Sequence, residues 1–291
     1  MAGPLVPLPE VERLSPACIR VLGGNPGKFT LQGTNTYLVG TGYRRILIDT
    51  GEGRPSWAAA LKSTLQQEGA RVETVLISHW HPDHTGGVDD ILQLCPDAKV
   101  YKNQAGEDGQ RDIVDGQAFT VQGASLTAFH TPGHTDDHMV FVLAEEDAMF
   151  TADNVLGQGT AVFEDLAAYL ASLERMRHLF RGRAYPGHGP VISDGPAKVE
   201  EYIRHRKERE DQVLRTLRSS KAADSATRSG ADGDGWTALE LVKVIYEDVP
   251  EELHGPATGG VFKILEKLEY EGAVARAPSG ERWVLKDRSS L

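Results

Sequence analysis

The chain has 291 residues, of which 40% are hydrophobic and 25% charged, and its formal net charge is −11. This length suits one large domain, or a domain of about 200 residues with a small second domain, and the apolar share is enough for a sizeable core. The acidic balance argues against a protein that grips a nucleic-acid backbone through a basic surface, although a local basic patch is compatible with it.

Targeting and membrane signals are weak in this sequence. The apolar runs are short and broken by charge, so we expect no membrane association, and the N-terminal residues lack the pattern of a secretory signal. Cys18 and Cys95 are the two cysteines, which provide no disulfide framework and fit a reducing compartment. We therefore expect a cytoplasmic protein.

The first two thirds of the chain alternate between strand and helix patterns. CIRVLGG, NTYLVG and RRILIDTGEG predict three short strands between about residues 16 and 50, and PSWAAALKSTLQQEG predicts an amphipathic helix that ends on glycine. VETVLIS (residues 72–78) predicts a buried strand, and GGVDDILQLCP a short helix. Further strands are expected at AKVYK, SLTAFHT, HMVFVLA and DAMFTAD, with a long helix at FEDLAAYLASLERMRHLF. Strands mixed with helices in this way predict a layered α/β fold.

The composition changes at about residue 192. AKVEEYIRHRKEREDQVLRTLRSS predicts one long charged helix, and the Gly/Ser/Asp-rich stretch at residues 221–235 predicts a flexible loop. Two helices, TALELVKVIYEDV and GGVFKILEKLEYEG, and a hairpin at GAVARAPSGERWVLKD follow, a pattern typical of a winged-helix-like domain. We expect a catalytic domain over residues 1–192 and a helical, winged-helix-like domain over residues 193–291. Because its helices carry many carboxylates, this domain is expected to pack or act as a lid rather than read nucleic acid.

HWHPDH, residues 79–84, follows the predicted buried strand directly. Alternation along a strand would place His79 and His81 on one side, and a turn at Pro82 would bring Asp83 and His84 to a second position nearby. Zinc prefers imidazole nitrogens and carboxylate oxygens, so this segment can contribute to two adjacent metal positions. The alternative, a histidine-rich surface turn without metal, is disfavoured by this spacing behind a buried strand.

Three later side chains lie at the ends of other predicted strands. They are His134 in TPGHTDDH, Asp153 in FTADN and His188 in AYPGHGP. Each alone would be an ordinary solvated turn residue, but their order after HWHPDH makes a joint site more plausible, because loops at strand ends carry functional groups. Mn²⁺ or Fe²⁺ would suit the same nitrogen and oxygen ligands as zinc.

HWHPDH, followed by His134, Asp153 and His188, resembles the metallo-β-lactamase superfamily over roughly residues 16–192. The resemblance implies an αββα sandwich with two Zn²⁺ at one edge. In the pattern of the family, one zinc is bound by His79, His81 and His134, the other by Asp83, His84 and His188, and Asp153 bridges them. Asp49 in LIDTG matches an aspartate that braces the site. Ala152 departs from the glycine of many members, and we expect its methyl group to be tolerated if its φ is negative.

The two metals imply a hydrolytic mechanism. A water made acidic by zinc and oriented by Asp83, the expected catalytic residue, would attack a carbonyl or phosphorus, and zinc would stabilise the developing oxyanion. His138 could reach the substrate or serve as a hydrogen-bonded neighbour of the site, and both readings stay open. His130 is expected to be structural, and His178, His205 and His254 to be solvated.

Longer segments are similar to one branch of this superfamily. PEVERLSPACIRVLGGNPGKFTLQGTNTYLVGTG, RRILIDTGEGRPSW, NVLGQGTAVFEDLAAYLASLERM and HGPATGG resemble the fungal atrochrysone carboxyl acyl-carrier-protein thioesterases, which serve non-reducing polyketide synthases. This resemblance implies hydrolysis of a polyketide thioester on the acyl carrier protein domain of such a synthase, in secondary-metabolite biosynthesis. The same segments resemble less closely the animal β-lactamase-like protein 2 family of single-strand endoribonucleases, which is the alternative; nucleic acid is the less favoured partner because of the net charge.

Two basic clusters, residues 175–183 and 203–209, could bind an acidic carrier protein or be solvated helix faces with ion pairs to nearby glutamates. Trp80 and Phe163 would be the stacking candidates if single-stranded RNA were the substrate. Loops 27–35 and 154–165 are expected near the metals by analogy with the family. Their polar residues Thr34, Asn35, Gln158 and Thr160 are not distinguished by sequence.

Overall fold

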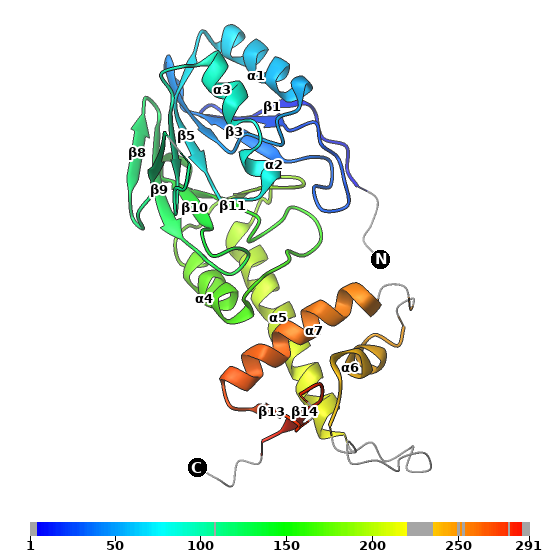
Figure 1. The fold of residues 1–291 in the computed structure, drawn as a ribbon. Coiled ribbons are helices and arrows are strands. Elements are labelled where there is room, and N and C mark those ends of the chain that lie inside the picture. Colours follow the sequence, from blue (N-terminus) through cyan, green and yellow to red (C-terminus); the bar gives the residue numbers. More distant parts are fainter. Residues whose placement is uncertain are drawn as a thin grey trace. The chain divides into compact units, whose positions relative to one another are not determined.

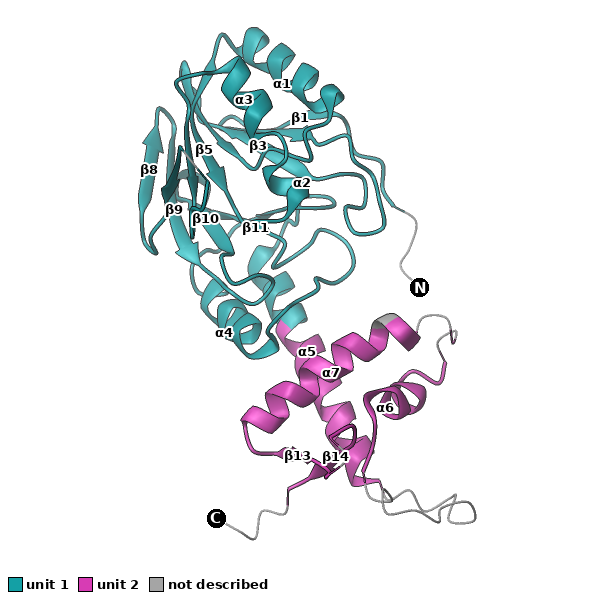
Figure 2. Ribbon diagram, in the orientation of Figure 1, with its two compact units in different colours: residues 1–202 teal, residues 203–291 magenta. Residues whose placement is uncertain are grey.

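The computed structural model describes residues 5–107, 109–219, 235–248, 251, 254–278 and 280–286. It divides into two compact units, residues 1–202 and 203–291 (Figure 2). The division falls inside helix α5 (Gly195–Arg218), whereas the domain boundary that we expect after residue 192 lies just before this helix.

Unit 1 is built on two β-sheets (Figure 1). The seven-stranded sheet has the order β1 (Val11–Ser15), β2 (Cys18–Leu22), β3 (Asn35–Val39), β4 (Arg44–Ile48), β5 (Arg71–Ile77), β6 (Lys99–Lys102) and β7 (Gln110–Asp112). The five-stranded sheet has the order β12 (Ala184–Pro186), β11 (Ala148–Ala152), β10 (Met139–Leu143), β9 (Ala124–His130) and β8 (Ala118–Val121). A 3-10 turn, η1 (Ala144–Glu146), connects β10 to β11.

Two buried clusters hold the layers together. In the first, Tyr37 and Ile46 of one sheet share a core with Phe141 and Phe150 of the other. In the second, the opposite face of the seven-stranded sheet packs against α1 (Pro55–Glu68) and α3 (Val88–Leu94), with Trp57 fully buried. Helix α4 (Leu166–Met176) lies beside the five-stranded sheet (Figure 1). The expected αββα sandwich is confirmed.

The predicted elements of unit 1 are present with shifted ends. Strands β1, β7 and β8 were not predicted, because each is three to five residues long and lacks a clear alternation. A four-residue helix, α2 (Pro82–Thr85), replaces the turn expected at Pro82. The long helix expected over FEDLAAYLASLERMRHLF begins only at Leu166, because the Asp165 side chain accepts a hydrogen bond from the Ala168 backbone N–H and caps it.

Unit 2 contains the rest of α5, then α6 (Ala238–Ile245), α7 (His254–Tyr270) and the hairpin of β13 (Val274–Arg276) and β14 (Trp283–Leu285). Helix α6 starts with a capping box of Thr237 and Glu240. The expectation that His254 is solvated is wrong: its side chain is buried, and its Nε2 donates to the Tyr246 carbonyl oxygen at 3.2 Å. Apart from Gly235, the loop predicted at residues 221–235 lies outside the described residues.

Within the described ranges, no helix combines the length and apolar character that crossing a bilayer requires.

Candidate metal centre

The predicted metal ligands converge because several strands end at one edge of the sandwich. β4 and β5 are parallel, and so are β11 and β12, so each pair delivers the residues after it to the same place. The turn between β9 and β10 also opens there, since the first residue of β10 pairs with the last of β9. Two backbone hydrogen bonds join the sheets at this edge, from Met139 to Ser78 at 2.8 Å and from Asn35 to Gly187 at 2.7 Å.

One group of four side chains consists of His79, His81, His134 and Asp153. His81 Nδ1 lies 2.9 Å from His79 Nε2 and 3.1 Å from His134 Nε2. Asp153 Oδ2 lies 3.7 Å from His134 Nε2. Two ligands of one tetrahedral zinc, each about 2.1 Å from the ion, would be about 3.4 Å apart, so these separations suit a shared cation. We call these four residues the first cluster.

A second group contains Asp83, His84 and His188. Asp83 Oδ2 lies 3.4 Å from His84 Nε2 and 3.3 Å from His188 Nε2. Asp153 also reaches this group, because its Oδ1 is 3.5 Å from His84 Nε2 and its Oδ2 is 3.3 Å from His188 Nε2. We call Asp83, His84 and His188 the second cluster. All seven predicted ligands are thus brought together, with Asp153 between the two clusters.

Hydrogen bonds orient the imidazoles so that one nitrogen of each faces its cluster. His84 Nδ1 donates to Asp49 Oδ2 at 2.7 Å, and His134 Nδ1 donates to the Val162 carbonyl oxygen at 2.9 Å. Each ring then presents the lone pair of Nε2 to its cluster, as metal-binding histidines do. Asp49 also accepts hydrogen bonds from the Ser78 N–H and hydroxyl, at 2.8 and 2.9 Å, which fits the bracing role expected for it.

Among the residues that the structure describes, two buried polar atoms at the centre have no hydrogen-bond partner, and this indicates whether the site suits a cation. Within the described part of the chain, His84 Nε2 and Asp153 Oδ1 are buried and have no hydrogen-bond partner. A buried polar atom without a partner is costly, and both atoms face lone-pair acceptors of the neighbouring ligands. A cation satisfies all of them at once, so the donor set fits a metal ion.

The electrostatics of the metal-free clusters lead to the same conclusion. Burial lowers the pKa of His79, and the nearby His84 lowers it further. At His188 burial also lowers the pKa, but the Asp153 and Asp83 carboxylates outweigh it and raise the pKa to about 9. Burial alone would raise the pKa of Asp83, yet the imidazoles of His188 and His84, whose Nε2 atoms lie 3.3 and 3.4 Å from its Oδ2, lower it far below its usual value. The ionised carboxylates thus favour positive charge in the site. In the metal-free protein, protonated histidine supplies that charge.

The chain next to the ligands differs from expectation in two ways. β5 ends at Ile77, so strand alternation is not what brings His79 and His81 together, although their rings are 4.7 Å apart. Ala152 has φ +43°, so the condition of a negative φ, under which we expected its methyl group to be tolerated, is not met. Its methyl group is accommodated in the left-handed region, at a cost of about 1–2 kcal/mol relative to glycine.

The other histidines near the centre take structural positions. His138 is fully buried; its Nδ1 is 3.1 Å from the Thr131 hydroxyl and its Nε2 accepts the Asp153 N–H at 3.3 Å. Two roles were left open for His138, contact with the substrate and a hydrogen-bonded position beside the site. The observed contacts support the second role. His130 donates from Nε2 to the Asp136 carbonyl oxygen at 2.8 Å and so holds the turn that carries His134.

Sequence reasoning missed Ser78 and Asn25. Ser78 bonds to Asp49 across 29 residues and to the neighbouring His79 Nδ1 at 2.9 Å. Asn25 bonds to Thr34, which in turn bonds to Asp83. A single serine or asparagine between strands carries no local signal for such contacts.

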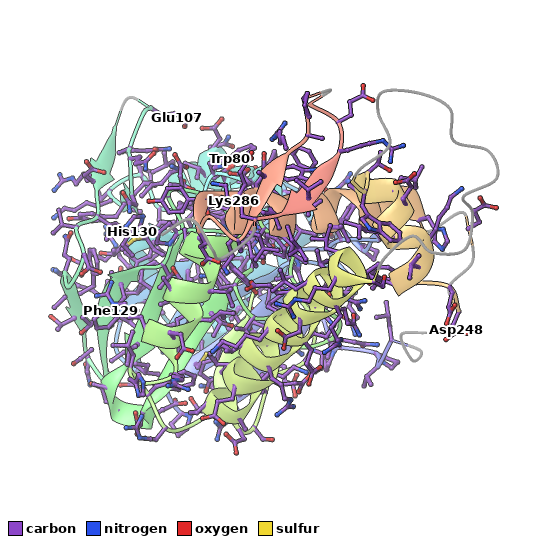
Figure 3. All side chains as sticks on the ribbon, turned by 90° about the horizontal axis from the view of Figure 1, so that it is seen from below. Trp80, Glu107, Phe129, His130, Asp248 and Lys286 are labelled. Atoms are coloured by element: carbon purple, nitrogen blue, oxygen red, sulfur yellow. The ribbon has the colours of Figure 1, made fainter. Side chains whose placement is uncertain are left out.

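Beside the clusters, Trp80 (labelled in Figure 3) is 48% exposed. The centroid of its ring lies 4.5 Å from that of the His81 ring. Phe163, the other aromatic side chain considered for stacking, packs against the Tyr169 ring at 5.5 Å. Trp80 therefore offers an apolar face next to a predicted ligand.

Comparisons with known proteins agree with this geometry. Residues 29–188 match the metallo-beta-lactamase superfamily, and residues 237–283 match the beta-lactamase associated winged helix domain. The lactamase-like protein adaB of Aspergillus niger is 48% identical over 280 residues, which cover 95% of this chain and 88% of the relative. The atrochrysone carboxyl ACP thioesterase of Aspergillus chevalieri is 46% identical over 286 residues, 97% of this chain and 91% of the relative.

Among solved structures, a metallo-beta-lactamase family protein from Thermus thermophilus superposes with a TM-score of 0.72 at 24% identity, over 94% of this chain and 100% of that one. At this identity the likeness concerns the fold alone. The family match spans more than half of the chain, and the curated relatives align over nearly all of it. The chain belongs to the metallo-beta-lactamase superfamily.

Proposed function

We propose that the protein is a metal-dependent thioesterase that hydrolyses a polyketide acyl thioester on an acyl carrier protein domain. The observation that carries the proposal is the meeting of seven nitrogen and oxygen ligands in two adjoining clusters. Relatives at 46% identity named atrochrysone carboxyl ACP thioesterases support the choice of a carrier-bound thioester. We propose that the carrier domain belongs to a non-reducing polyketide synthase.

We assign two Zn²⁺ to the clusters. His79, His81 and His134 would hold one ion, Asp83, His84 and His188 the other, and Asp153 would contact both. When bound in such a site, zinc lowers the pKa of a water molecule to about 7 and polarises a carbonyl oxygen. Imidazole and carboxylate ligands also accept Mn²⁺ or Fe²⁺, so the identity of the metal needs measurement.

The protein's own groups would orient the reactants. The Asp83 side chain is 21% exposed, whereas that of His84 is fully buried, so Asp83 has an edge that a water or a substrate can reach. We therefore assign Asp83 the orientation of the attacking water in addition to its role as a ligand. The carbonyl carbon would be attacked, and the carbon–sulfur bond would break with departure of a thiolate. Because a thiolate leaves without first being protonated, no separate general acid is required.

The Trp80 face next to His81 suits a flat, apolar acyl group. Trp80 is also the contact that an RNA base would use in the alternative endoribonuclease, so it does not separate the two functions. The names of the relatives and the net charge of −11 favour the thioester.

For the carrier protein, we propose docking through basic residues of unit 1. Arg175 is already engaged, since it donates to Asp115 and to the His130 carbonyl oxygen and lies over the Phe129 ring (Phe129 and His130 are labelled in Figure 3). Arg177 is paired with Glu174 at 3.0 Å.

Two further arginines of the same segment are exposed and donate to uncharged backbone carbonyl groups. They are Arg181, which bonds to Phe180, and Arg183, which bonds to Leu14. Because the observed bonds of Arg181 and Arg183 go to neutral carbonyl groups and those of Arg175 and Arg177 include carboxylates, Arg181 and Arg183 are the better docking candidates. We also propose that the enzyme works in the cytoplasm, where its buried free cysteines Cys18 and Cys95 stay reduced.

The decisive assay offers the purified protein two substrates, an acyl-loaded carrier protein and single-stranded RNA, each with and without a chelator. We expect chelator-sensitive release of the acyl group and no cleavage of RNA. Asp153→Ala should abolish release, because Asp153 contacts both clusters. RNA cleavage without acyl release would refute the thioesterase assignment, and full activity in Asp153→Ala would refute the metal assignment.

A further inference from the structure

A hydrogen-bond chain begins in the loop before β3 and ends on Asp83. Asn25 Nδ2 donates to Thr34 Oγ1 at 3.0 Å, and Thr34 Oγ1 donates to Asp83 Oδ2 at 3.1 Å. Asn25 Oδ1 meanwhile accepts the Thr34 backbone N–H at 2.9 Å, which fixes the orientation of the Asn25 amide. Because the hydroxyl already accepts a hydrogen from Asn25, its own hydrogen is directed to Asp83. Thr34 is fully buried and Asn25 nearly so, so both residues of the chain that leads to Asp83 are shielded from solvent.

The next residue, Asn35, holds the turn that carries His188. Its backbone N–H donates to the Gly187 carbonyl oxygen at 2.7 Å. Its side-chain Nδ2 donates to the carbonyl oxygens of Pro186 at 2.9 Å and Gly189 at 2.8 Å, on either side of His188. Thr34 itself forms a backbone bridge with His188. Thr34 and Asn35 thus act on two members of the second cluster.

The first cluster is held by other groups. Ser78 supports His79, and the Val162 carbonyl oxygen supports His134. The bonds from Asn25, Thr34 and Asn35 described above end on Asp83 and on the turn around His188. The bonds from Asn25, Thr34 and Asn35 therefore act on the second cluster, whereas Ser78 contacts His79 and also bonds to Asp49, which holds His84. Asp153 is common to both clusters.

We infer that Asn25, Thr34 and Asn35 are positioning residues that set the metal affinity of the second cluster independently of the first. Asp83 lies on the four-residue helix α2 and its side chain is 21% exposed, so packing surrounds the carboxylate only in part. The Thr34 hydroxyl supplies the missing constraint on the carboxylate, and Oδ2 is the oxygen that faces His84 and His188. Removal of a group that orients a metal ligand typically weakens metal affinity about 10- to 100-fold. The inference rests on the metal centre of the proposed function but not on its substrate.

The test titrates metal-free protein with Zn²⁺ in competition with a chromogenic chelator, so that the first and second equivalents are resolved. Thr34→Val removes the hydroxyl at nearly constant volume, and Thr34→Ser keeps it. We expect Thr34→Val to bind one equivalent as the wild type does and the other about 10- to 100-fold more weakly, with Thr34→Ser close to the wild type. Absorption spectra with two equivalents of Co²⁺ should show the same difference between the variants: one site incompletely filled in Thr34→Val, and both sites filled in Thr34→Ser.

Thr36→Val is the matched control. Thr36 is also fully buried and lies two residues further along the chain, in β3, but its hydroxyl donates to the Val21 carbonyl oxygen and accepts from Trp57 Nε1. It should leave both zinc affinities unchanged, whatever it does to the melting temperature. If Thr34→Val does not fold, Asn25→Ala should show the same selective loss.

Equal weakening of both equivalents, or wild-type binding by the Thr34→Val variant, would overturn the inference. A wild-type protein that bound no metal would instead refute the proposed function, so the two failures can be distinguished.

Discussion

Asp49→Asn should damage the centre although it changes a single atom. Asp49 accepts three hydrogen bonds, from the Ser78 N–H at Oδ1 and from the Ser78 hydroxyl and His84 Nδ1 at Oδ2. Asparagine has one carbonyl oxygen and an NH₂ group in place of two acceptors. If its NH₂ group faced Ser78, two N–H groups would oppose each other at 2.8 Å. If it faced His84, the imidazole would have to carry its proton on Nε2, which is the atom that points into the second cluster.

The two orientations predict different magnitudes. An opposed, unsatisfied pair of buried donors costs about 1–3 kcal/mol of unfolding free energy. The wrong tautomer of His84 should instead weaken the second metal position about 10- to 100-fold, or about 1.4–2.8 kcal/mol of binding free energy. The amide will adopt whichever arrangement costs less, so one of these two losses must appear.

Both quantities can be measured on the same preparation. Urea denaturation of the metal-free protein reports the unfolding free energy, and chelator competition reports the affinity for each zinc equivalent. Asp97→Asn is the control, since Asp97 is exposed and paired with Arg71 at 2.9 Å, with no role assigned at the centre. Unchanged stability together with unchanged affinity in Asp49→Asn would refute the reasoning.

Three further predictions use the same structure. In metal-free protein the pKa of His188 is about 9 in the folded state against 6.5 unfolded, so its contribution of about 3 kcal/mol is complete below pH 6.5 and is lost as the pH rises to 9. The melting temperature of protein kept metal-free with a chelator should fall between pH 6.5 and pH 9. A melting temperature that did not change over this pH range would contradict the prediction. Gly187→Ala would place a methyl group 2.3 Å from Asp153 Oδ1 and should weaken metal binding at least about tenfold. Gly259→Ala, with nothing within 4 Å, should not, and wild-type zinc affinity in Gly187→Ala would exclude this clash. A double-mutant cycle on the exposed Asp115–Arg175 pair should give a coupling of about 0.2–1 kcal/mol in urea denaturation. Arg175 lowers the pKa of Asp115, so the coupling should be present above about pH 4 and lost in more acid solution, and a coupling unchanged at low pH would argue against it.

Local sequence patterns were sufficient to predict the helices and strands whose structure depends mainly on their own residues. The apolar run VETVLIS is β5 within one residue, and the helix expected at PSWAAALKSTLQQEG is α1 with Gly69 as its left-handed C-cap. The meeting of the predicted ligands was expected from their positions at strand ends, where loops carry functional groups. Their division into two sets came from the resemblance to the family, and strand alternation, the spacing argument for His79 and His81, did not hold.

The supports of the centre were beyond such patterns, because they depend on contacts between distant segments. Ser78 and Asp49 are 29 residues apart, Thr34 and Asp83 are 49 apart, and Asn35 reaches Pro186 across 151. Each is a small polar residue at a strand end, where solvation is the usual fate. The supports become visible only when burial is known: a buried hydroxyl or amide must find a partner, and here the partners are proposed metal ligands or the groups beside them. The partners of these residues are therefore recognised in the structure and not in the sequence. By orienting the proposed ligands, polar residues that do not contact the cation can still determine the affinity with which it is bound.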